Sequence, residues 1–188
     1  LEGLEGVAVY MDDVVVYGDD HESHDTRLQA VVDRMKAAGL KLNREKCKFR
    51  QGTVEFLGHS ISKEGVKITD RKKAAIQALK APKNKEELQS ALGMINYLTR
   101  FVPGAQTILQ PLNELLKEKT EWRWDHPQEE ALSKIKKMIA TGPVLAFFDP
   151  ALPTVVAADS SAYGLGAVLL QGHGETLKPV AFCSRMLT

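Results

Sequence analysis

The chain has 188 residues, of which 44% are hydrophobic and 26% are charged, values that are ordinary for a folded globular protein. No apolar run approaches the roughly 20 residues that cross a bilayer, and no basic segment followed by an apolar core opens the sequence, so we expect neither a membrane protein nor a secreted one. Cys47 and Cys183 have no metal-ligand spacing around them, so ordinary packing roles in a reducing compartment are expected.

The net charge of +1 conceals a strong asymmetry along the chain. Residues 1–33 carry nine acidic side chains against one basic one, whereas residues 34–85 carry fifteen basic side chains against four acidic ones. A basic segment beside an acidic one suits a polyanion held next to a cation site, although charge runs are usually solvated surface. The charge pattern alone therefore leaves nucleic-acid binding open.

Two short runs of β-favouring residues, 7–10 and 14–17, flank Met11, Asp12 and Asp13. Runs this short predict strands, and the simplest geometry is a tight hairpin with the two aspartates at its tip. Adjacent carboxylates repel each other and favour a cation nearby, which a divalent metal would supply. A solvated turn that binds nothing is the alternative.

A helix and two further strands are predicted after the hairpin. Residues 19–23 supply capping groups for a helix that ends at Gly39 and packs its apolar stripe on the hairpin. Residues 40–42 and 54–57 alternate as strands do, with a turn between the flanking segments.

Two amphipathic helices are predicted next. The first covers residues 69–81, begins at Thr69 or Asp70 and closes before Pro82. The second begins at Asn84, runs through Leu98 and stops before Pro103. Helical periodicity returns around Pro111, which we place near a helix start or at a kink.

The last third of the chain changes from helical to extended character. Trp122 and Trp124 either stack on bases or belong to a core, and we expect them in the core, on one side of a strand. Residues 125–128 open a helix that ends at Gly142. Strands are then predicted at the start of a mixed sheet, over residues 154–159, 164–170 and 178–183.

The segment from Tyr10 to Asp13, Tyr-Met-Asp-Asp between hydrophobic strands, resembles the Tyr-X-Asp-Asp motif of reverse transcriptases. Four further segments, in the right order, resemble the polymerase of gypsy-type long-terminal-repeat retroelements: residues 39–47, 56–59, 88–103 and 159–164. The resemblance covers nearly the whole chain, from Val7 to Leu187.

The resemblance implies an α+β fold made of parts of two modules. Residues 1–66 would be the C-terminal part of a polymerase palm, an antiparallel hairpin sheet plus a helix, with the primer grip. Residues 67–117 would be a helical thumb and residues 118–150 a connection or tether. Residues 151–188 would begin a ribonuclease H-like domain, with an incomplete α/β sheet.

The resemblance also implies roles for individual residues. Asp12 and Asp13 would be catalytic and would hold Mg²⁺, with Mn²⁺ as an alternative, and Asp159 would be the first metal ligand of the ribonuclease H site. Lys46 matches a catalytic lysine near the phosphates of the incoming nucleotide, where it neutralises or protonates the leaving pyrophosphate. The residues expected at the primer grip or against nucleic acid are Tyr10, Met11, Phe56, Leu57, Gly58, His59, Gly93 and Asn96.

Several of these residues also have an ordinary structural interpretation, which the sequence leaves open. Lys46 and Asn96 are equally suited to a solvated surface, and Gly93 to close packing between helices. His59 fits a hydrogen-bonded turn, and a single aspartate such as Asp159 is usually a cap or turn former.

The implied function is that of an RNA-directed DNA polymerase, which extends a primer on an RNA or DNA template from deoxynucleoside triphosphates by two-metal nucleotidyl transfer. The family needs a third aspartate from an earlier strand, and a ribonuclease H site uses about four acidic residues. We therefore expect that the isolated chain neither polymerises nor cleaves, and that the rest of a Pol polyprotein or a second subunit completes it.

The expected location is the cytoplasm, in virus-like particles, with the nucleus as an alternative. No membrane partner is expected. The competing hypothesis is a non-enzymatic, retroelement-derived protein that binds nucleic acid through the basic segment or is purely structural.

Overall fold

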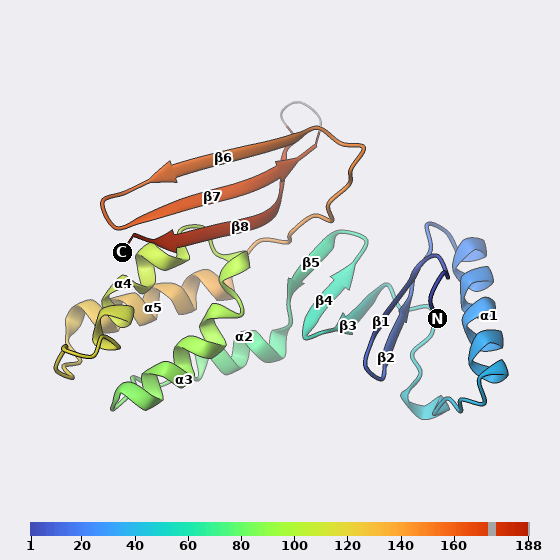
Figure 1. Cartoon of the computed structure of the whole chain (residues 1–188), viewed down its shortest axis with the longest axis horizontal. Helices are drawn as coiled ribbons and strands as arrows, with labels where there is room; N and C mark the ends of the chain where they lie inside the picture. Colours follow the sequence, from blue (N-terminus) through green and yellow to red (C-terminus); the bar gives the residue numbers. More distant parts are fainter. Residues whose placement is uncertain (173–175, 188) are drawn as a thin grey trace. The chain divides into compact units, whose positions relative to one another are not determined.

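The computed structural model describes residues 1–172 and 176–187, and the chain divides into two compact units, residues 1–57 and 58–188 (Figure 1). The part of the chain expected to begin a ribonuclease H-like domain includes residues 173–175 and 188, which lie outside the described residues. None of the described helices is long and apolar enough to cross a bilayer. The domain boundaries expected after residues 66, 117 and 150 stay predictions.

The first unit opens with the predicted hairpin, which the structure confirms. Strand β1 (Val7–Tyr10) pairs antiparallel with β2 (Asp13–Val16), and the register places Tyr10 opposite Asp13. Met11 and Asp12 are therefore the two residues of the turn, and Asp13 is the first residue of the second strand.

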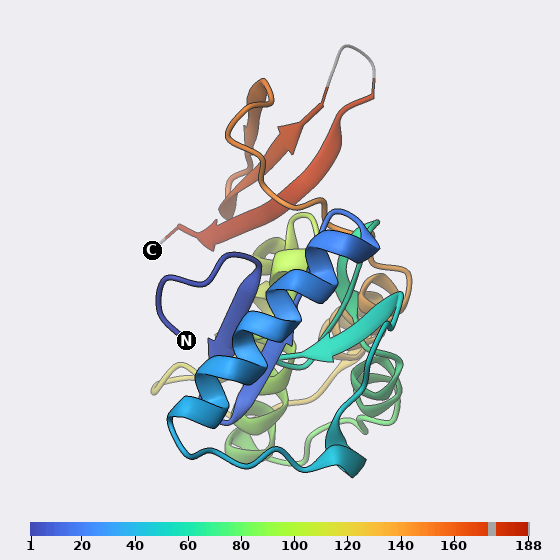
Figure 2. The same ribbon diagram turned by 90° about the vertical axis from the view of Figure 1, so that its right-hand side faces the viewer.

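Helix α1 (His21–Ala37) follows the hairpin and lies along it (Figure 2). It begins with a capping box, in which Ser23 N donates to Asp20 Oδ1 at 2.7 Å and Asp20 N donates to Ser23 Oγ at 3.2 Å. The backbone hydrogen bond from Ser23 holds the pKa of Asp20 below its ordinary value. The helix buries Val31 and ends at Ala37, with Ala38 as its C-cap next to Gly39, which has φ 71°. The predicted helix is thus confirmed at both ends.

The strand predicted for residues 40–42 is wrong. This segment has no regular structure, and Leu40 and Leu42 are 58% and 50% exposed, so the alternating pattern faces no core. A one-turn 3-10 helix, η1 (Arg44–Lys46), follows, because the side chain of Asn43 accepts from Glu45 N at 3.0 Å and turns the backbone. Strand β3 (Thr53–Phe56) forms at the position predicted for the second strand.

The second unit begins with a β-hairpin followed by helices. Strand β4 (His59–Ser62) pairs antiparallel with β5 (Gly65–Ile68). The remaining elements up to residue 140 are α2 (Asp70–Gln77), α3 (Lys85–Asn96), the 3-10 helix η2 (Thr99–Phe101), α4 (Ala105–Leu115) and α5 (His126–Ala140). Thr69 caps α2 and Asn84 caps α3, as predicted.

The predicted helices differ from the observed ones mainly at their ends. Helix α2 ends at Gln77, four residues before Ala81, and α3 ends at Asn96, two residues before Leu98. Helix α4 begins well before Pro111, which lies inside it. Helix α5 begins directly after Asp125, within the predicted segment, and it has a capping box between Asp125 and Gln128.

One hydrophobic core joins the helices of this unit. Its largest fully buried side chains are Leu88, Ile95, Leu98, Phe101, Val102, Leu109, Leu112, Ile135, Ile139 and Leu145. Trp122 and Trp124 pack against this core with ring centroids 6.1 Å apart, as expected, although their segment is irregular and not a strand.

The C-terminal sheet consists of β6 (Thr154–Ser160), β7 (Gly164–Gln171) and β8 (Lys178–Met186), in that spatial order. Both pairings among the described strands are antiparallel, so the mixed character that we expected is not seen in this part of the sheet. Strand β8 packs on α4, where Gln106 N donates to Ser184 Oγ at 3.1 Å.

Candidate active site

The tip of the first hairpin presents two adjacent carboxylates to solvent. Asp12 and Asp13 are exposed, and within the described chain neither side chain has a hydrogen bond or an ion pair. Met11 beside them has φ 52°, in the left-handed region, and its side chain is 84% exposed. The turn therefore holds two charged oxygen donors that no internal cation neutralises.

This donor set fits a magnesium ion that substrate helps to hold. Mg²⁺ prefers carboxylate oxygens, keeps several waters and is commonly bound by one or two carboxylates together with substrate phosphates. Among the described residues, no group of three or more His, Cys, Asp or Glu side chains could hold a metal. Asp12 and Asp13 therefore suit an open, substrate-assisted site and not a closed one.

The left-handed backbone at Met11 leads to a prediction about stability. A residue with a Cβ is strained at this φ, whereas glycine is not. Met11→Gly is expected to raise the free energy of unfolding of the first unit by about 0.5 kcal/mol. This value is near the lower limit of the changes in stability that glycine and proline substitutions produce. Met11→Ala, which removes the same side chain and keeps the strain, is the control, and equal denaturation midpoints for the two variants would contradict the prediction.

Lys46 ends the 3-10 turn η1 and its side chain is exposed. Its backbone N–H donates to Asn43 O at 3.1 Å, and its ammonium has no ion pair within the described chain. The ammonium is thus available to an anion, as the role implied by the resemblance requires.

The turn after β3 has two consecutive left-handed residues, Leu57 with φ 50° and Gly58 with φ 68°. Two such residues in succession are typical of a type I′ turn. A Cβ added at Gly58 would collide with the end of the Lys72 side chain. The absent side chain at Gly58 thus makes room for the end of the Lys72 side chain, and the expected role of Gly58 at the primer grip stays a prediction.

His59, the first residue of β4, is held by an aromatic cluster. Its ring stacks on Tyr97 with centroids 5.3 Å apart and planes at 7°, and its Nε2 lies 3.0 Å from the Tyr97 hydroxyl. Its Nδ1 is buried without a hydrogen-bond partner in the described chain. Burial, and then the charges of Lys72 and Arg100, lower the pKa of His59, so the ring is neutral at pH 7.

The lowered pKa of His59 predicts how stability depends on pH. The unfolded chain binds a proton at His59 near the ordinary pKa of 6.5 and the folded unit binds it only at lower pH, so the free energy of unfolding falls as pH drops below 6.5. His59→Gln removes this titration. The wild-type loss of stability between pH 7 and pH 5.5 is expected to exceed that of His59→Gln, measured by urea unfolding. His126→Gln, at an exposed histidine, is the control and should show the same pH dependence of stability as wild type. Identical pH profiles for wild type and His59→Gln would refute the assignment of this titration to His59.

Sequence reasoning missed Lys72 and Tyr97, which the structure places beside His59 and Gly58. The Lys72 ammonium lies 3.8 Å from the centroid of the Tyr97 ring. Tyr97 is the C-cap of α3, four residues after Gly93. A large aromatic residue at this spacing was a signal that helical periodicity could have found. Lys72 carried no comparable signal, because its position depends on the path of the chain.

The exposed face of α3 carries the other predicted nucleic-acid contacts. Gly93 and Asn96 are both exposed, and a Cβ built at Gly93 would meet nothing within 4 Å. The close helix packing that was the alternative for Gly93 therefore has no counterpart among the described residues. Tyr97 and Met94 extend this face and are 48% and 44% exposed.

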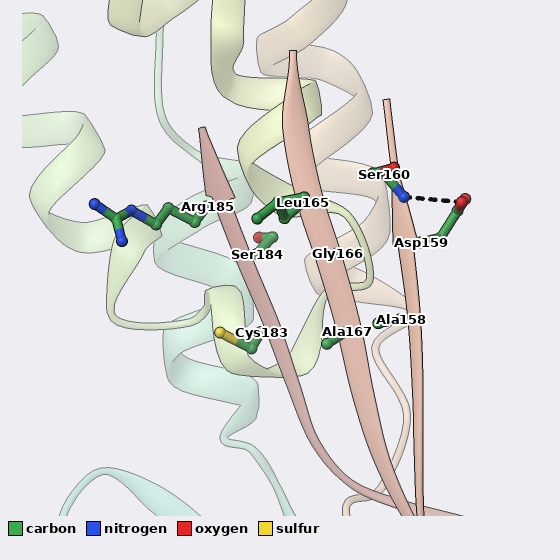
Figure 3. Close-up of a pocket in the computed structure, with 9 residues that line it drawn as sticks. All are labelled: Ala158, Asp159, Ser160, Leu165, Gly166, Ala167, Cys183, Ser184 and Arg185. Atoms are coloured by element: carbon green, nitrogen blue, oxygen red, sulfur yellow. Dashed lines mark hydrogen bonds between the residues drawn. The ribbon is translucent and has the colours of Figure 1, made fainter. Parts of the chain in front are cut away.

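Asp159 lies on the edge strand β6 and is exposed. Its Oδ1 accepts from Ser160 N at 2.8 Å, and it borders a shallow concavity over β6, β7 and β8 (Figure 3). No second acidic residue lines that concavity. The described part of this sheet thus offers one carboxylate at the concavity, and the role of Asp159 as a metal ligand stays a prediction.

Comparison with known proteins agrees with this arrangement. Residues 4–61 match the family model of reverse transcriptase (RNA-dependent DNA polymerase), and residues 124–188 match that of the RNase H-like domain found in reverse transcriptase. The Transposon Tf2-3 and Tf2-7 polyproteins of Schizosaccharomyces pombe are 34% and 33% identical over 183 residues, 97% of the chain. The chain spans 14% of the length of these relatives.

Solved structures of a foamy viral protease-reverse transcriptase are also similar. The one in complex with dsDNA is 28% identical with a TM-score of 0.88, and the alignment covers 100% of this chain and 40% of that one. The one in complex with an RNA/DNA hybrid is 28% identical with a TM-score of 0.86, and the alignment covers 98% and 25%. The chain therefore belongs to the reverse transcriptase family of gypsy-type retroelement polyproteins, and it contains part of the polymerase and part of the ribonuclease H-like domain.

Proposed function

We propose that the chain is part of an RNA-directed DNA polymerase that extends a primer on an RNA or DNA template, next to a ribonuclease H-like module. The observation that supports this most is the pair Asp12 and Asp13, which are exposed at a hairpin tip without an internal partner. Carboxylates in that state suit a cation that bridges protein and nucleotide.

Asp12 and Asp13 would hold the divalent metal, Mg²⁺ or Mn²⁺. When bound, the metal neutralises charge on the reacting phosphate and lowers the pKa of the attacking 3′-hydroxyl. The exposed side chains of Tyr10 and Met11 lie beside the carboxylates and would contact the primer end. The Lys46 ammonium would neutralise the leaving pyrophosphate and give it a proton.

Nucleic acid is the partner that the exposed groups of the second unit suit. The face of α3 with Gly93 and Asn96 is open, and the ammonium of Lys72 lies against the exposed Tyr97 ring. The side chains of Met94, Asn96 and Tyr97 on this face carry no formal charge, and Lys72 beside Tyr97 supplies a cation that a phosphate would contact. The foamy viral relatives bind dsDNA and an RNA/DNA hybrid, which supports the same class of partner here. Deoxynucleoside triphosphates, a completing Pol polyprotein segment and a site of action in cytoplasmic virus-like particles complete the proposal.

Binding of a fluorescent RNA/DNA primer–template across a salt series tests the proposal. Electrostatic binding gives a linear fall of log affinity with log salt, with a slope set by the number of phosphates contacted. Lys72→Gln is expected to weaken binding and reduce the slope by about one, as for loss of one phosphate contact. Lys134→Gln on α5 is the control with the same charge change. Absence of measurable affinity at low salt would leave a purely structural protein.

A further inference from the structure

The segment that carries Lys46 is shaped locally but is weakly attached. From Lys41 to Gln51 every residue except Cys47 is exposed. Asn43 organises the turn, because its side chain accepts from Glu45 N and its carbonyl accepts from Lys46 N at 3.1 Å and from Cys47 Sγ at 3.2 Å. These bonds determine the shape of the turn but do not connect it to the rest of the unit.

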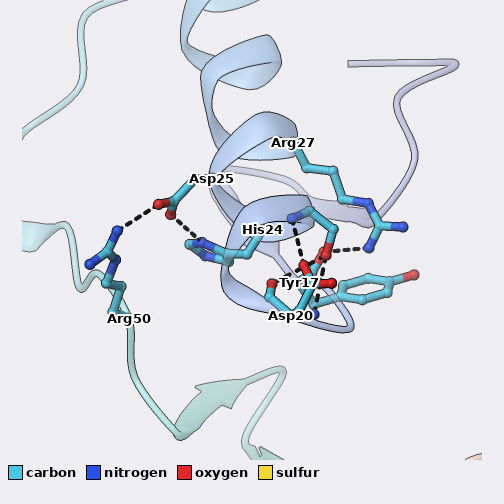
Figure 4. Close-up of polar contacts among 7 residues, drawn as sticks. Tyr17, Asp20, His24, Asp25, Arg27 and Arg50 are labelled. Atoms are coloured by element: carbon cyan, nitrogen blue, oxygen red, sulfur yellow. Dashed lines mark hydrogen bonds and ion pairs between the residues drawn. The ribbon is translucent and has the colours of Figure 1, made fainter.

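A single polar contact connects this segment to α1. Arg50 Nη2 lies 2.5 Å from Asp25 Oδ2, across 25 residues of sequence (Figure 4). The other carboxylate oxygen of Asp25 accepts from His24 Nδ1 at 3.0 Å. No other hydrogen bond or ion pair of the described residues 41–52 reaches outside the segment. The orientation of the segment on the unit therefore depends on Asp25.

Helix α1, which carries Asp25, is itself anchored to the hairpin. Arg27, two residues on, donates from Nη1 to Tyr17 O at 3.0 Å, directly after β2. An added Cβ at Gly6, just before β1, would collide with both Tyr17 O and the Arg27 side chain. A continuous series of contacts thus leads from the strands that carry the aspartates, through Arg27 and Asp25, to Arg50.

We propose that Asp25 is a positioning residue for nucleotide binding: through Arg50 it holds the η1 turn in place relative to the hairpin, so that Lys46 meets the triphosphate of the incoming nucleotide. The inference rests on the proposed function of Lys46 and adds the residue that orients it. Arg50 lies four residues after Lys46, close enough for the tether to restrict the turn.

Two properties of the pair determine the size of the effect. The side chains of Arg50 and Asp25 are 65% and 44% exposed, so solvent screens the pair and its loss should have a graded effect. The hydrogen bond from His24, and then Arg50, hold the pKa of Asp25 below its ordinary value, so the carboxylate stays charged near neutral pH. Arg50 has φ 51°, which is unfavourable with a Cβ, and the ion pair helps to maintain it.

The experiment titrates the full 188-residue chain with inorganic triphosphate and Mg²⁺ and follows the Lys46 amide by NMR. Asp25→Asn is compared with Asp33→Asn, which removes the same charge from the same helix. Within the described part of the chain, the Asp33 side chain accepts a hydrogen bond only from Gln29. If Asp25 acted only through its negative charge, both variants would bind triphosphate more tightly than wild type. If Asp25 positions the η1 turn, only Asp25→Asn should bind triphosphate more weakly, by about two- to five-fold, which corresponds to the free energy of a surface ion pair. Backbone order parameters of residues 43–50 should fall in Asp25→Asn and not in Asp33→Asn.

The charge-reversed pair Asp25→Arg with Arg50→Asp completes the design. It should recover both the triphosphate affinity and the order parameters that Asp25→Asn loses. If Lys46→Ala abolishes the response to triphosphate seen in wild type but Asp25→Asn keeps the wild-type affinity, the positioning role of Asp25 is overturned and the proposed function of Lys46 is not. No response of Lys46 in wild type would overturn its proposed function, and the inference with it.

Discussion

Replacing Asp12 or Asp13 with Asn is expected to reduce nucleotide incorporation by about 10²–10³-fold, because each carboxylate would stabilise charge that develops in the transition state. The assay uses a chimera in which this chain replaces the matching 183 residues of the Tf2-3 polyprotein, since the relatives are several times longer than the chain. Primer extension on an RNA template is the measurement. Asp33→Asn, an exposed carboxylate on α1, should leave incorporation unchanged.

The free energy of unfolding of each variant distinguishes a loss of catalysis from misfolding. The two aspartates are exposed and unpaired within the described chain, so either substitution should change the free energy of unfolding by less than about 0.5 kcal/mol. A variant with more than a tenth of wild-type incorporation would show that its carboxylate does not belong to the catalytic site.

The same two carboxylates predict how the isolated chain binds metal. Calorimetry of the 188-residue chain with Mg²⁺ alone should show weak binding, because two exposed carboxylates leave most of the coordination sphere to water. Binding should strengthen when inorganic triphosphate supplies further oxygens. Tight Mg²⁺ binding to wild type that disappears in Asp12→Asn would show a closed site and contradict the substrate-assisted one.

The second large effect concerns the helical core of residues 58–188. Ile95 and Leu109 are fully buried in the core, on α3 and α4. Truncating either to Ala removes apolar contacts and leaves a cavity, so the free energy of unfolding should fall by about 3–4 kcal/mol. That is a large fraction of the 5–15 kcal/mol typical of a folded domain.

Tryptophan fluorescence measures this unit selectively. The chain has two tryptophans, Trp122 and Trp124, and both pack against this core. Urea unfolding monitored at these residues should show the loss for Ile95→Ala and Leu109→Ala. Met94, on the same helix as Ile95, is 44% exposed, so Met94→Ala should lower the free energy of unfolding by less than about 1 kcal/mol. Equal losses for Ile95→Ala and Met94→Ala would place the core elsewhere.

Local sequence signals predicted the elements whose boundaries depend on nearby residues. The start of α5 depends on Asp125 and the three residues after it, and the hairpin of β1 and β2 needs only a two-residue turn. Burial of the predicted apolar stripes follows from their 3.6-residue period. Such features depend on neighbours in the chain, so a sequence pattern contains them.

The prediction at residues 40–42 failed for the opposite reason. Alternation in Leu40 and Leu42 suits a strand, but a strand also needs a partner and a core to face, and both leucines are exposed. The end of α2, which the sequence placed too late, has the same explanation. Lys136 Nζ donates to Leu79 O at 2.7 Å and satisfies a carbonyl that would have accepted a helical hydrogen bond in a longer helix. Partners distant in sequence decided both cases.

The sequence by itself determined the hairpin that presents Asp12 and Asp13, the helical periods and the resemblance to reverse transcriptases, because each depends on residues a few positions apart. Only the tertiary structure decided that Lys72 lies against Gly58 and Tyr97, and that Arg50 pairs with Asp25. These contacts join residues 14 or more positions apart, and the path of the chain, which local propensity does not specify, brings them together.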